Sequence, residues 1–342
     1  RVGVFGMMAI MKIMEKLQLS IDEIDALTGP LAGRPKSATF RTADVVGIDT
    51  LIKVAKGVYD NCPNDEAKDI FNIPAWLNKM VENNWLGDKT GQGFFKKVKT
   101  PDGKSDIQVL NLKTMEYTAR QKPKFATLEA AKPIEDLPAR LKILINGTDK
   151  AGEFYRQFHY SLFSYISHRI PEISDEVYRL DDAMMAGFGW EIGAFESWDA
   201  SGVAKTTEAM KAAGFTVAKW VDDMLAAGHN TFYKVENGKR LYYDVAGKTY
   251  KNLPGGDTFL VMKYFTNQTI WKNSSSRVYH LGDDVLGLEW NTKMNSIGGE
   301  VLESIQKGIS LAEEKYKGLV IANEGANFSA GANVAMIFML AI

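Results

Sequence analysis

The stretch SIDEIDALTGPLAGRPKSATFRTADVVGID, residues 20–49, decides the fold because the chain carries it a second time. The second copy is SDEVYRLDDAMMAGFGWEIGAFESWDASGV, residues 174–203. Both contain an Asp-Ala pair, which aligns Asp25 with Asp182. Three further pairs keep identical spacing, namely Phe40 with Phe195, Asp44 with Asp199, and Gly47 with Gly202. An internal repeat of this kind predicts a duplicated structural unit.

A long apolar segment precedes each copy, at residues 2–19 and 154–173. Each segment has about the length of a buried helix of five turns. The sequence therefore predicts a mainly α-helical protein, with one helical domain at residues 1–97 and a second copy of it at residues 140–203.

Two other segments join the larger units. Residues 98–139 combine the turn TPDG, the strand-like IQVLNL and several prolines, which is typical of a structured linker. Residues 204–282 read as a helical and hairpin extension. There Asn237-Gly238 between aromatic runs predicts a two-residue β-hairpin.

Charge and cysteine content exclude several functional classes. With 41 basic and 42 acidic residues, the net charge is 41 − 42 = −1, so no bulk field favours nucleic acid or an anionic membrane. The one cysteine, Cys62, excludes an intrachain disulfide and fits a reducing compartment, so we expect a cytoplasmic protein. The apolar tail, residues 334–342, is too short for a transmembrane segment. That tail and the initial Arg1 lead us to expect a piece of a longer protein.

The first copy closes with GDKTGQGFF, residues 87–95, which completes an ordered motif. The motif is carried by Asp25, Gly33, Phe40, Asp44, Gly47, Asp49, Gly87, Lys89, Gly91, Gly93 and Phe94. It resembles the C-terminal helical domain of 3-hydroxyacyl-CoA dehydrogenases, well over residues 1–97 and more weakly over 140–203. Duplicated domains of this kind occur in the multifunctional β-oxidation enzymes.

This resemblance implies that an NAD-binding domain with a catalytic His–Glu pair precedes the helical domain. NAD would then be bound outside this chain, and we expect no cofactor-binding residue in it. The helical domains would help to cover the acyl-CoA cleft and to build a homodimer, and a thiolase is the further partner implied.

Two other motifs carry no function in our interpretation. GFGWEIG, residues 187–193, has the spacing G-x-G-x-x-x-G and follows a helical pattern, whereas a dinucleotide loop needs a strand before it. His159 and His168 are nine positions apart on one predicted helix, which places them on opposite faces. We predict no metal site.

The last sixty residues predict a different kind of structure. VLGLEW, residues 285–290, reads as a strand, and the apolar spacing after residue 298 reads as a helix. GLVIAN, residues 318–323, is suited to a parallel strand that is buried on both faces. Residues 283–342 therefore predict a strand, a crossover helix and a strand at the start of an α/β fold.

GANFSAGANV, residues 325–334, follows the second of these strands. A loop of glycine and alanine lets a ligand approach backbone N–H groups that no side chain shields. Such groups can stabilise the negative oxygen that develops on a thioester carbonyl. Composition alone leaves open the alternative, a tight turn before a helical tail that binds nothing.

The segment NTKMNSI, residues 291–297, and the later FSAGAN together resemble the opening of the crotonase superfamily of enoyl-CoA hydratases and isomerases. The carriers are Asn291, Lys293, Asn295, Ser296, Ile297, Phe328, Ala330, Gly331 and Ala332. The resemblance implies that the N–H of Ala332 is one of two oxyanion-hole donors. It also implies that acyl-CoA lies along Lys293, Met294, Ala330, Gly331 and Asn333, although the family usually has Asp at the last position.

Taken together, the two resemblances predict part of a bifunctional 3-hydroxyacyl-CoA dehydrogenase and enoyl-CoA hydratase of fatty-acid β-oxidation. Its substrates would be CoA thioesters. Two alternatives stay open: a non-catalytic scaffold that dimerises or cradles acyl-CoA, and an enoyl-CoA isomerase in place of the hydratase.

Overall fold

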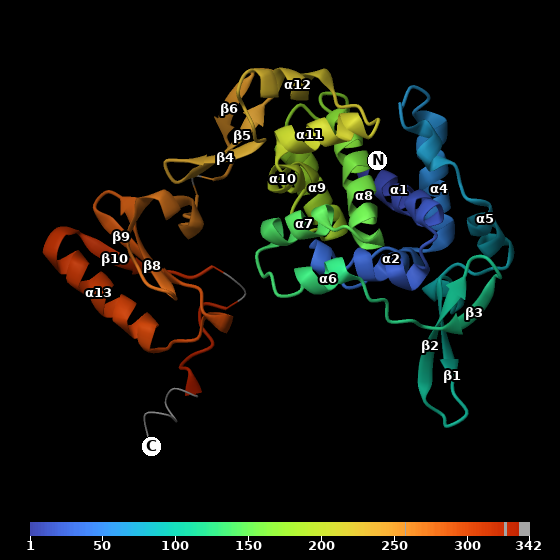
Figure 1. Cartoon of the computed structure of the whole chain (residues 1–342), viewed down its shortest axis with the longest axis horizontal. Coiled ribbons are helices and arrows are strands. Elements are labelled where there is room, and N and C mark those ends of the chain that lie inside the picture. Colours follow the sequence, from blue (N-terminus) through green and yellow to red (C-terminus); the bar gives the residue numbers. More distant parts are fainter. Residues whose placement is uncertain (257, 325–326, 335–342) are drawn as a thin grey trace. The chain divides into compact units, whose positions relative to one another are not determined.

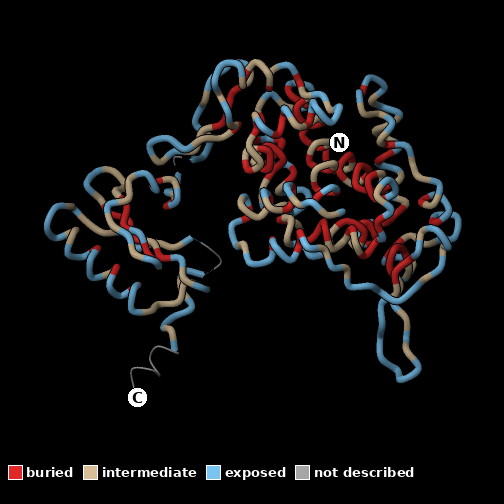
Figure 2. Tube along the Cα trace, viewed as in Figure 1, coloured by how far each residue is buried: buried red, intermediate tan, exposed pale blue. Residues whose placement is uncertain are grey.

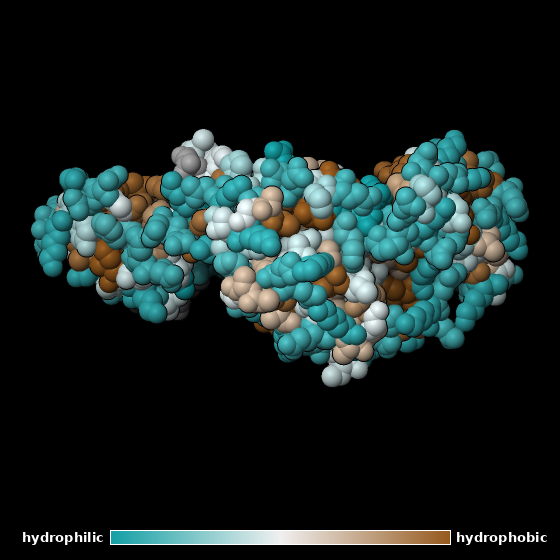
Figure 3. Space-filling model, turned by 90° about the horizontal axis from the view of Figure 1, so that it is seen from above, coloured by the Kyte–Doolittle hydropathy of each residue, from teal (hydrophilic) through white to brown (hydrophobic). Residues whose placement is uncertain are grey.

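The computed structural model describes residues 1–256, 258–324 and 327–334 (Figure 1). Its contacts divide the chain into two compact units. The first consists of Arg1–Phe232 and Tyr243–Thr249, and the second of Tyr233–Tyr242 and Tyr250–Ile342. The face seen in Figure 3 is largely hydrophilic, with scattered hydrophobic patches.

The first unit is mainly helical, which confirms the predicted class. Its helices are α1 (Val2–Leu17), α2 (Ile21–Leu27), α3 (Phe40–Val46), α4 (Ile48–Asn61), α5 (Ala75–Glu82), α6 (Ala126–Ala131), α7 (Leu137–Asn146), α8 (Lys150–Ser167), α9 (Val177–Phe188), α10 (Ala194–Ser201), α11 (Val203–Ala212) and α12 (Lys219–Ala226). Its antiparallel sheet consists of β1 (Phe95–Lys99), β2 (Ser105–Asn111) and β3 (Glu116–Ala119). Within the described part of the chain, no helix is both long enough and apolar enough to cross a membrane.

The two long apolar segments form α1 and α8, which pack against each other in the core (Figure 2). The rings of Phe5 and Tyr165 stack between them with centroids 3.7 Å apart. Helix α8 ends at Ser167, six residues before the predicted end at 173. Pro171 explains the earlier end, because proline disfavours the helical conformation of the residue before it and has no N–H to donate.

A buried ionic cluster links α8 to the loop before α5. The Asp65 side chain is fully buried, and its Oδ2 accepts a hydrogen bond from Tyr165 Oη at 2.7 Å. The same oxygen lies 3.2 Å from Arg169 Nη1 and 3.4 Å from Arg1 Nε. Arg169 is itself only 1% exposed and also pairs with Glu66 and Glu172. Two cations from distant parts of the sequence thus share one buried carboxylate.

The duplication is visible in how each copy holds the helix that follows its motif. Asp25 accepts the backbone N–H groups of Thr39, Phe40 and Arg41, at 3.2, 2.7 and 3.2 Å, at the start of α3. In the second copy, Asp181 accepts those of Phe195 and Glu196, at 2.9 and 3.1 Å, at the start of α10. Asp181 is therefore the counterpart of Asp25, and the alignment with Asp182 was wrong by one residue.

A second pair of aspartates continues the correspondence past the motif. Asp44 accepts the N–H groups of Phe94 and Phe95 at 2.8 and 2.9 Å, just before or at the start of β1. Asp199 accepts the N–H of Phe232 at 2.7 Å, directly before β4 (Tyr233–Glu236). Both phenylalanine segments lead into a three-stranded antiparallel sheet, and the second sheet adds β5 (Lys239–Asp244) and β6 (Thr249–Asn252). The domain boundaries given above stay predictions.

The predicted hairpin at Asn237-Gly238 is confirmed. Glu236 pairs with Lys239, which leaves these two residues as the turn. Their φ angles are 50° and 74°, as the mirror-image turns of two-residue hairpins require.

Gly93, in the first copy, lies where the backbone packs closely against its neighbours. A Cβ atom there would lie 2.1 Å from Asp44 Oδ1 and 2.7 Å from the Cα of Gly87. We expect Gly93→Ala to destabilise the first unit by about 1–3 kcal/mol, because the clash displaces the carboxylate that holds two buried N–H groups. Urea unfolding followed by circular dichroism at the helical band measures this loss.

Gly57→Ala in α4 is the control for Gly93→Ala. No heavy atom lies within 4 Å of the Cβ position at Gly57. This substitution is expected to stabilise the protein by about 0.5–1 kcal/mol, since alanine restricts the unfolded chain more than glycine does. Equal effects of the two variants would contradict the close-packing role of Gly93.

The second unit contains a four-stranded sheet in the order β10-β9-β8-β7. Its elements are β7 (Thr269–Lys272), β8 (Ser276–Gly282), β9 (Val285–Trp290), α13 (Gly299–Lys315) and β10 (Gly318–Ile321). Strands β9 and β10 are parallel, and α13 connects them, so the predicted strand–helix–strand unit is confirmed. Val301 of α13 packs into a core formed by Val278, Leu286, Leu288 and Trp290.

The expectation that the last strand is buried on both faces is wrong for the described residues. Strand β10 lies at the edge of the sheet, so only one strand pairs with it. Val320 and Ile321 are 45% and 38% exposed. The apolar run therefore predicted the position of the strand correctly, but it did not predict how far the strand is buried.

Candidate functional site

The candidate site lies where the parallel strands β9 and β10 end. Ligands of α/β proteins commonly bind outside the carboxyl ends of the strands. The first predicted segment, residues 291–297, follows β9 directly, and the second, residues 328–333, follows β10 after a short loop. Gly325, Ala326 and, of the predicted tail at 334–342, residues 335–342 lie outside the described residues.

The two predicted segments pair with each other through their backbones. The N–H of Ala330 donates to the carbonyl of Met294 at 3.1 Å, and the N–H of Ile297 donates to that of Gly331 at 2.8 Å. The N–H of Asn333 donates back to Ile297 at 2.9 Å. Ile297 and Ala332 thus form an isolated parallel bridge. Residues that are about 35 positions apart in the sequence meet in one short stretch of backbone.

The bridge orients the backbone of Ala332 away from its partner. Two hydrogen bonds form this bridge, and their donors are the N–H of Ile297 and the N–H of Asn333. In a parallel pairing, the N–H of the residue between the bonded groups points to the opposite side. Among the described residues the N–H of Ala332 donates no hydrogen bond, and Ala330, Gly331 and Ala332 are exposed. A donor without a shielding side chain is therefore open to a ligand.

The Lys293–Met294 segment lies on the surface beside this backbone. Met294 is 65% exposed, and its φ of 55° lies in the left-handed region, as does that of Asn295 at 52°. A non-glycine residue in this region costs roughly 1–2 kcal/mol. Strained backbone of this kind is concentrated at functional sites, where the surrounding structure holds it in place.

Asn295 connects the first segment to the chain that follows β10. Its Nδ2 donates to the carbonyls of Glu324 and Asn327 at 3.3 and 3.0 Å. In return, Ser329 Oγ donates to the carbonyl of Asn295 at 2.7 Å. Asn295 belongs to the motif, but the sequence did not indicate this anchoring role.

Asn323 and Trp290 form a second anchor, which sequence reasoning missed. The N–H of Trp290 donates to Asn323 Oδ1 at 2.9 Å, and Asn323 Nδ2 donates to the carbonyl of Phe328 at 2.7 Å. The rings of Trp290 and Phe328 meet edge to face with centroids 5.6 Å apart. The only signal in the sequence was a polar residue at the end of the predicted apolar strand, residues 318–323.

We expect Asn295→Ala to lower the free energy of local opening of this loop by about 1–2 kcal/mol, because it removes two hydrogen bonds and places alanine at a left-handed φ. Hydrogen exchange of the Ala330 and Asn333 amides measures the opening. Asn291→Ala is the control, since its side chain makes no hydrogen bond within the described residues. Unchanged exchange in Asn295→Ala would contradict the anchoring role.

The two motifs to which the sequence analysis assigned no function form a turn between helices and part of the buried core. GFGWEIG joins α9 to α10, and Gly189 closes α9 with a φ of 63°, so no strand precedes this run and it does not fit a dinucleotide. Burial lowers the pKa of His159 to about 3, and its Nδ1 lies 2.8 Å from the carbonyl of Tyr155. Within residues 1–256, 258–324 and 327–334, no three His, Cys, Asp or Glu side chains are grouped to hold a metal.

Comparison with known proteins identifies similarity in both the first copy and the whole chain. The family model of the 3-hydroxyacyl-CoA dehydrogenase C-terminal domain matches residues 1–97. A Bacillus subtilis (strain 168) protein with the name "Probable 3-hydroxyacyl-CoA dehydrogenase" is 42% identical over 341 residues, which are 99% of this chain and 42% of that protein.

Two other relatives differ in how much of the chain they match. A Rickettsia prowazekii protein, whose name describes a fatty acid oxidation complex trifunctional enzyme, is 25% identical over 340 residues, 98% of this chain and 42% of its own length. A Deinococcus radiodurans protein, also named as a 3-hydroxyacyl-CoA dehydrogenase, is 46% identical over 99 residues, 29% of this chain and 28% of its own. The chain thus spans less than half the length of the curated relatives it matches. The predicted resemblance of residues 1–97 to the C-terminal domain of 3-hydroxyacyl-CoA dehydrogenases is confirmed.

Proposed function

We propose that this chain is part of a fatty-acid β-oxidation enzyme that oxidises 3-hydroxyacyl-CoA and hydrates 2-enoyl-CoA. The dehydrogenase part rests on the match of residues 1–97 and on the similarity to the Bacillus subtilis protein. The hydratase part rests on one observation, the outward N–H of Ala332 at the carboxyl ends of β9 and β10.

In the hydratase reaction, the thioester carbonyl of the enoyl-CoA would accept a hydrogen bond from the N–H of Ala332. Addition of water at the β-carbon places negative charge on that oxygen. A fixed main-chain donor stabilises this charge without any reorganisation during the reaction. The anchors from Asn295 and Asn323 would keep the donor in position.

In the dehydrogenase reaction, the helical unit would shape the acyl-CoA cleft. The glycine run at residues 187–193 does not fit a dinucleotide, and we assign to the helical unit no step that involves NAD. NAD, a homodimer, a thiolase partner and a cytoplasmic location belong to this proposal as expectations from the resemblance.

The exposed apolar residues of the second unit support a larger α/β domain. Val320, Ile321, Phe328 and Leu302 are 45%, 38%, 56% and 54% exposed. In the proposal, further residues of a crotonase fold would cover these side chains.

The test uses the purified protein at its natural length. Crotonyl-CoA should lose its conjugated absorbance through hydration, and 3-hydroxybutyryl-CoA with NAD should give NADH. Formation of NADH alone would reject the hydratase part, and conversion of a 3-enoyl-CoA to a 2-enoyl-CoA without hydration would replace it by an isomerase. Absence of every activity would favour a non-catalytic scaffold.

A further inference from the structure

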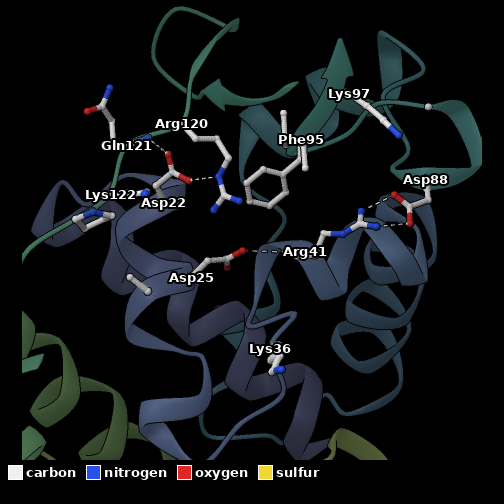
Figure 4. A pocket seen from close by; sticks show the side chains of 14 residues that line it. Asp22, Asp25, Lys36, Arg41, Asp88, Phe95, Lys97, Arg120, Gln121 and Lys122 are labelled. Atoms are coloured by element: carbon white, nitrogen blue, oxygen red, sulfur yellow. Dashed lines mark hydrogen bonds and ion pairs between the residues drawn. The ribbon is translucent and has the colours of Figure 1, made fainter. Parts of the chain in front are cut away.

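A cavity of about 570 Å³ lies in the first unit, between the α2–α3 region and the sheet β1–β3 (Figure 4). It belongs to none of the sites described above. Its volume is within the range of ligand pockets, about 300–1,000 Å³, and it is too large for a single inorganic ion. Five cationic side chains line it, namely Lys36, Arg41, Lys97, Arg120 and Lys122.

The lining carries a positive charge that the protein as a whole lacks. Three carboxylates face the five cations, those of Asp22, Asp25 and Asp88, so the formal charge is 5 − 3 = +2. The chain has a net charge of −1. A local excess of this kind in a cavity attracts anions, because the low-dielectric walls concentrate the field.

The acidic residues of the cavity are already committed to partners. Asp88 receives two hydrogen bonds from Arg41, at 2.5 and 2.8 Å. Asp22 receives one from Arg120 Nε at 2.8 Å and one from the N–H of Gln121 at 2.7 Å. Asp25 accepts the three N–H groups at the start of α3, and burial raises its pKa to about 7, which reduces its negative charge near neutral pH.

The three lysines of the cavity differ from these carboxylates. Within the described part of the chain, Lys36, Lys97 and Lys122 take part in no hydrogen bond or ion pair of their side chains. They come from three different segments, the loop before α3, strand β1 and the chain after β3, and they stand on different sides of the cavity (Figure 4). Three separated ammonium groups suit a ligand with more than one anionic group.

Arg120 adds a positioned guanidinium. Its Nε bonds to Asp22, and its Cζ lies 4.8 Å from the centroid of the Phe95 ring. These contacts fix the plane of the guanidinium and leave its terminal N–H groups facing the cavity beside Phe95 (Figure 4). A guanidinium that is fixed in this way matches the oxygens of a phosphate group.

We propose that this cavity binds a multiply phosphorylated small molecule of nucleotide size, with its phosphates held by Arg120, Lys97, Lys122 and Lys36. Phe95, Ile107 and Pro123 supply apolar wall for the organic part of the ligand. CoA and NAD both carry such phosphate groups. The proposal does not depend on either proposed reaction.

The experiment titrates the 342-residue chain with CoA, dephospho-CoA, NAD and inorganic pyrophosphate by calorimetry at low salt. We expect saturable binding of CoA or NAD. Tighter binding of CoA than of dephospho-CoA and NAD would identify the 3′-phosphate as the group recognised, whereas equal binding of the three would identify the diphosphate. Binding of none of the four would overturn the proposal.

The double variant Lys97→Ala, Lys122→Ala should weaken binding at least tenfold, because it removes two charge-assisted contacts. Lys99→Ala is the matched control: this exposed lysine lies on the same strand but does not line the cavity. We expect its affinity to change less than twofold. Equal losses in Lys99→Ala and in the double variant would show general attraction of anions and would overturn a specific site.

Discussion

Replacing Asp65 by alanine is expected to lower the free energy of unfolding of the first unit by about 3–5 kcal/mol. The Asp65 side chain is fully buried and is shared by Arg169 and Arg1. Its removal leaves Arg169 without its buried counter-charge, and the exposed fractions of the two remaining partners, Glu66 and Glu172, are 42% and 48%. The loss of one carboxylate thus leaves a charge in the core that solvated partners compensate only in part.

The same substitution also removes two uncharged contacts. Asp65 Oδ1 accepts the N–H of Ala67 at 2.9 Å, and Oδ2 accepts the hydroxyl of Tyr165 at 2.7 Å. A donor that loses its acceptor costs about 1–3 kcal/mol, and this cost is included in the 3–5 kcal/mol expected for Asp65→Ala. Asp65→Asn, which keeps one acceptor oxygen but no charge, should therefore fall between the wild type and Asp65→Ala.

Urea unfolding, monitored by circular dichroism at the helical band, measures this effect because most helices belong to the first unit. Asp102→Ala is the matched control, since Asp102 pairs with Lys104 on the surface, where their side chains are 56% and 83% exposed. We expect no measurable change there. An Asp65→Ala variant as stable as Asp102→Ala would mean that the cluster contributes nothing to the fold.

The second large effect concerns Ala332. In the protein at its natural length, Ala332→Pro should lower kcat for enoyl-CoA hydration by about 10²–10³, the usual loss when one oxyanion donor is removed. Proline has no N–H. The NAD-dependent oxidation should change little, because the proposed dehydrogenase part lies in the other unit.

Ala332→Ser is the control for this prediction, as it changes the side chain and leaves the N–H. Its hydration rate should stay within a few-fold of the wild type. Retained dehydrogenase activity and an unchanged dichroism spectrum would show that the proline variant is folded. Wild-type hydration by a folded Ala332→Pro variant would exclude this N–H from the reaction.

Local patterns in the sequence predicted the parts of the fold that depend on neighbouring residues. Apolar periodicity located α1 and α13, and Asn237-Gly238 located a turn, because each signal acts within a few residues of backbone. For residues 291–297 and 328–333, a family resemblance implied that both segments lie along acyl-CoA. It did not predict the backbone pairing, which the structure shows between Ile297 and Ala332.

The missed features depend on partners that are far apart in the chain. Asp65 and Arg169 are separated by 104 positions, and Asp22 and Arg120 by 98. No periodicity records such contacts, since any charged residue on a surface gives the same local signal. For the same reason the sequence did not indicate the cavity with Lys36, Lys97 and Lys122. The shift from Asp182 to Asp181 arose because helix rotation, rather than residue identity, decides which of two adjacent carboxylates faces α10.

The bridge between Ile297 and Ala332 has a consequence for how the proposed donor can be found. A reactive group that belongs to the peptide unit is the same for every residue except proline, so alanine scanning would pass over it, and here the residue is already alanine. Replacement of that amide by an ester, through incorporation of lactic acid at position 332, would exchange the N–H for an oxygen atom and leave every side chain intact. It would also weaken the Gly331 carbonyl as an acceptor for the N–H of Ile297, so the stability of the bridge has to be measured beside the activity.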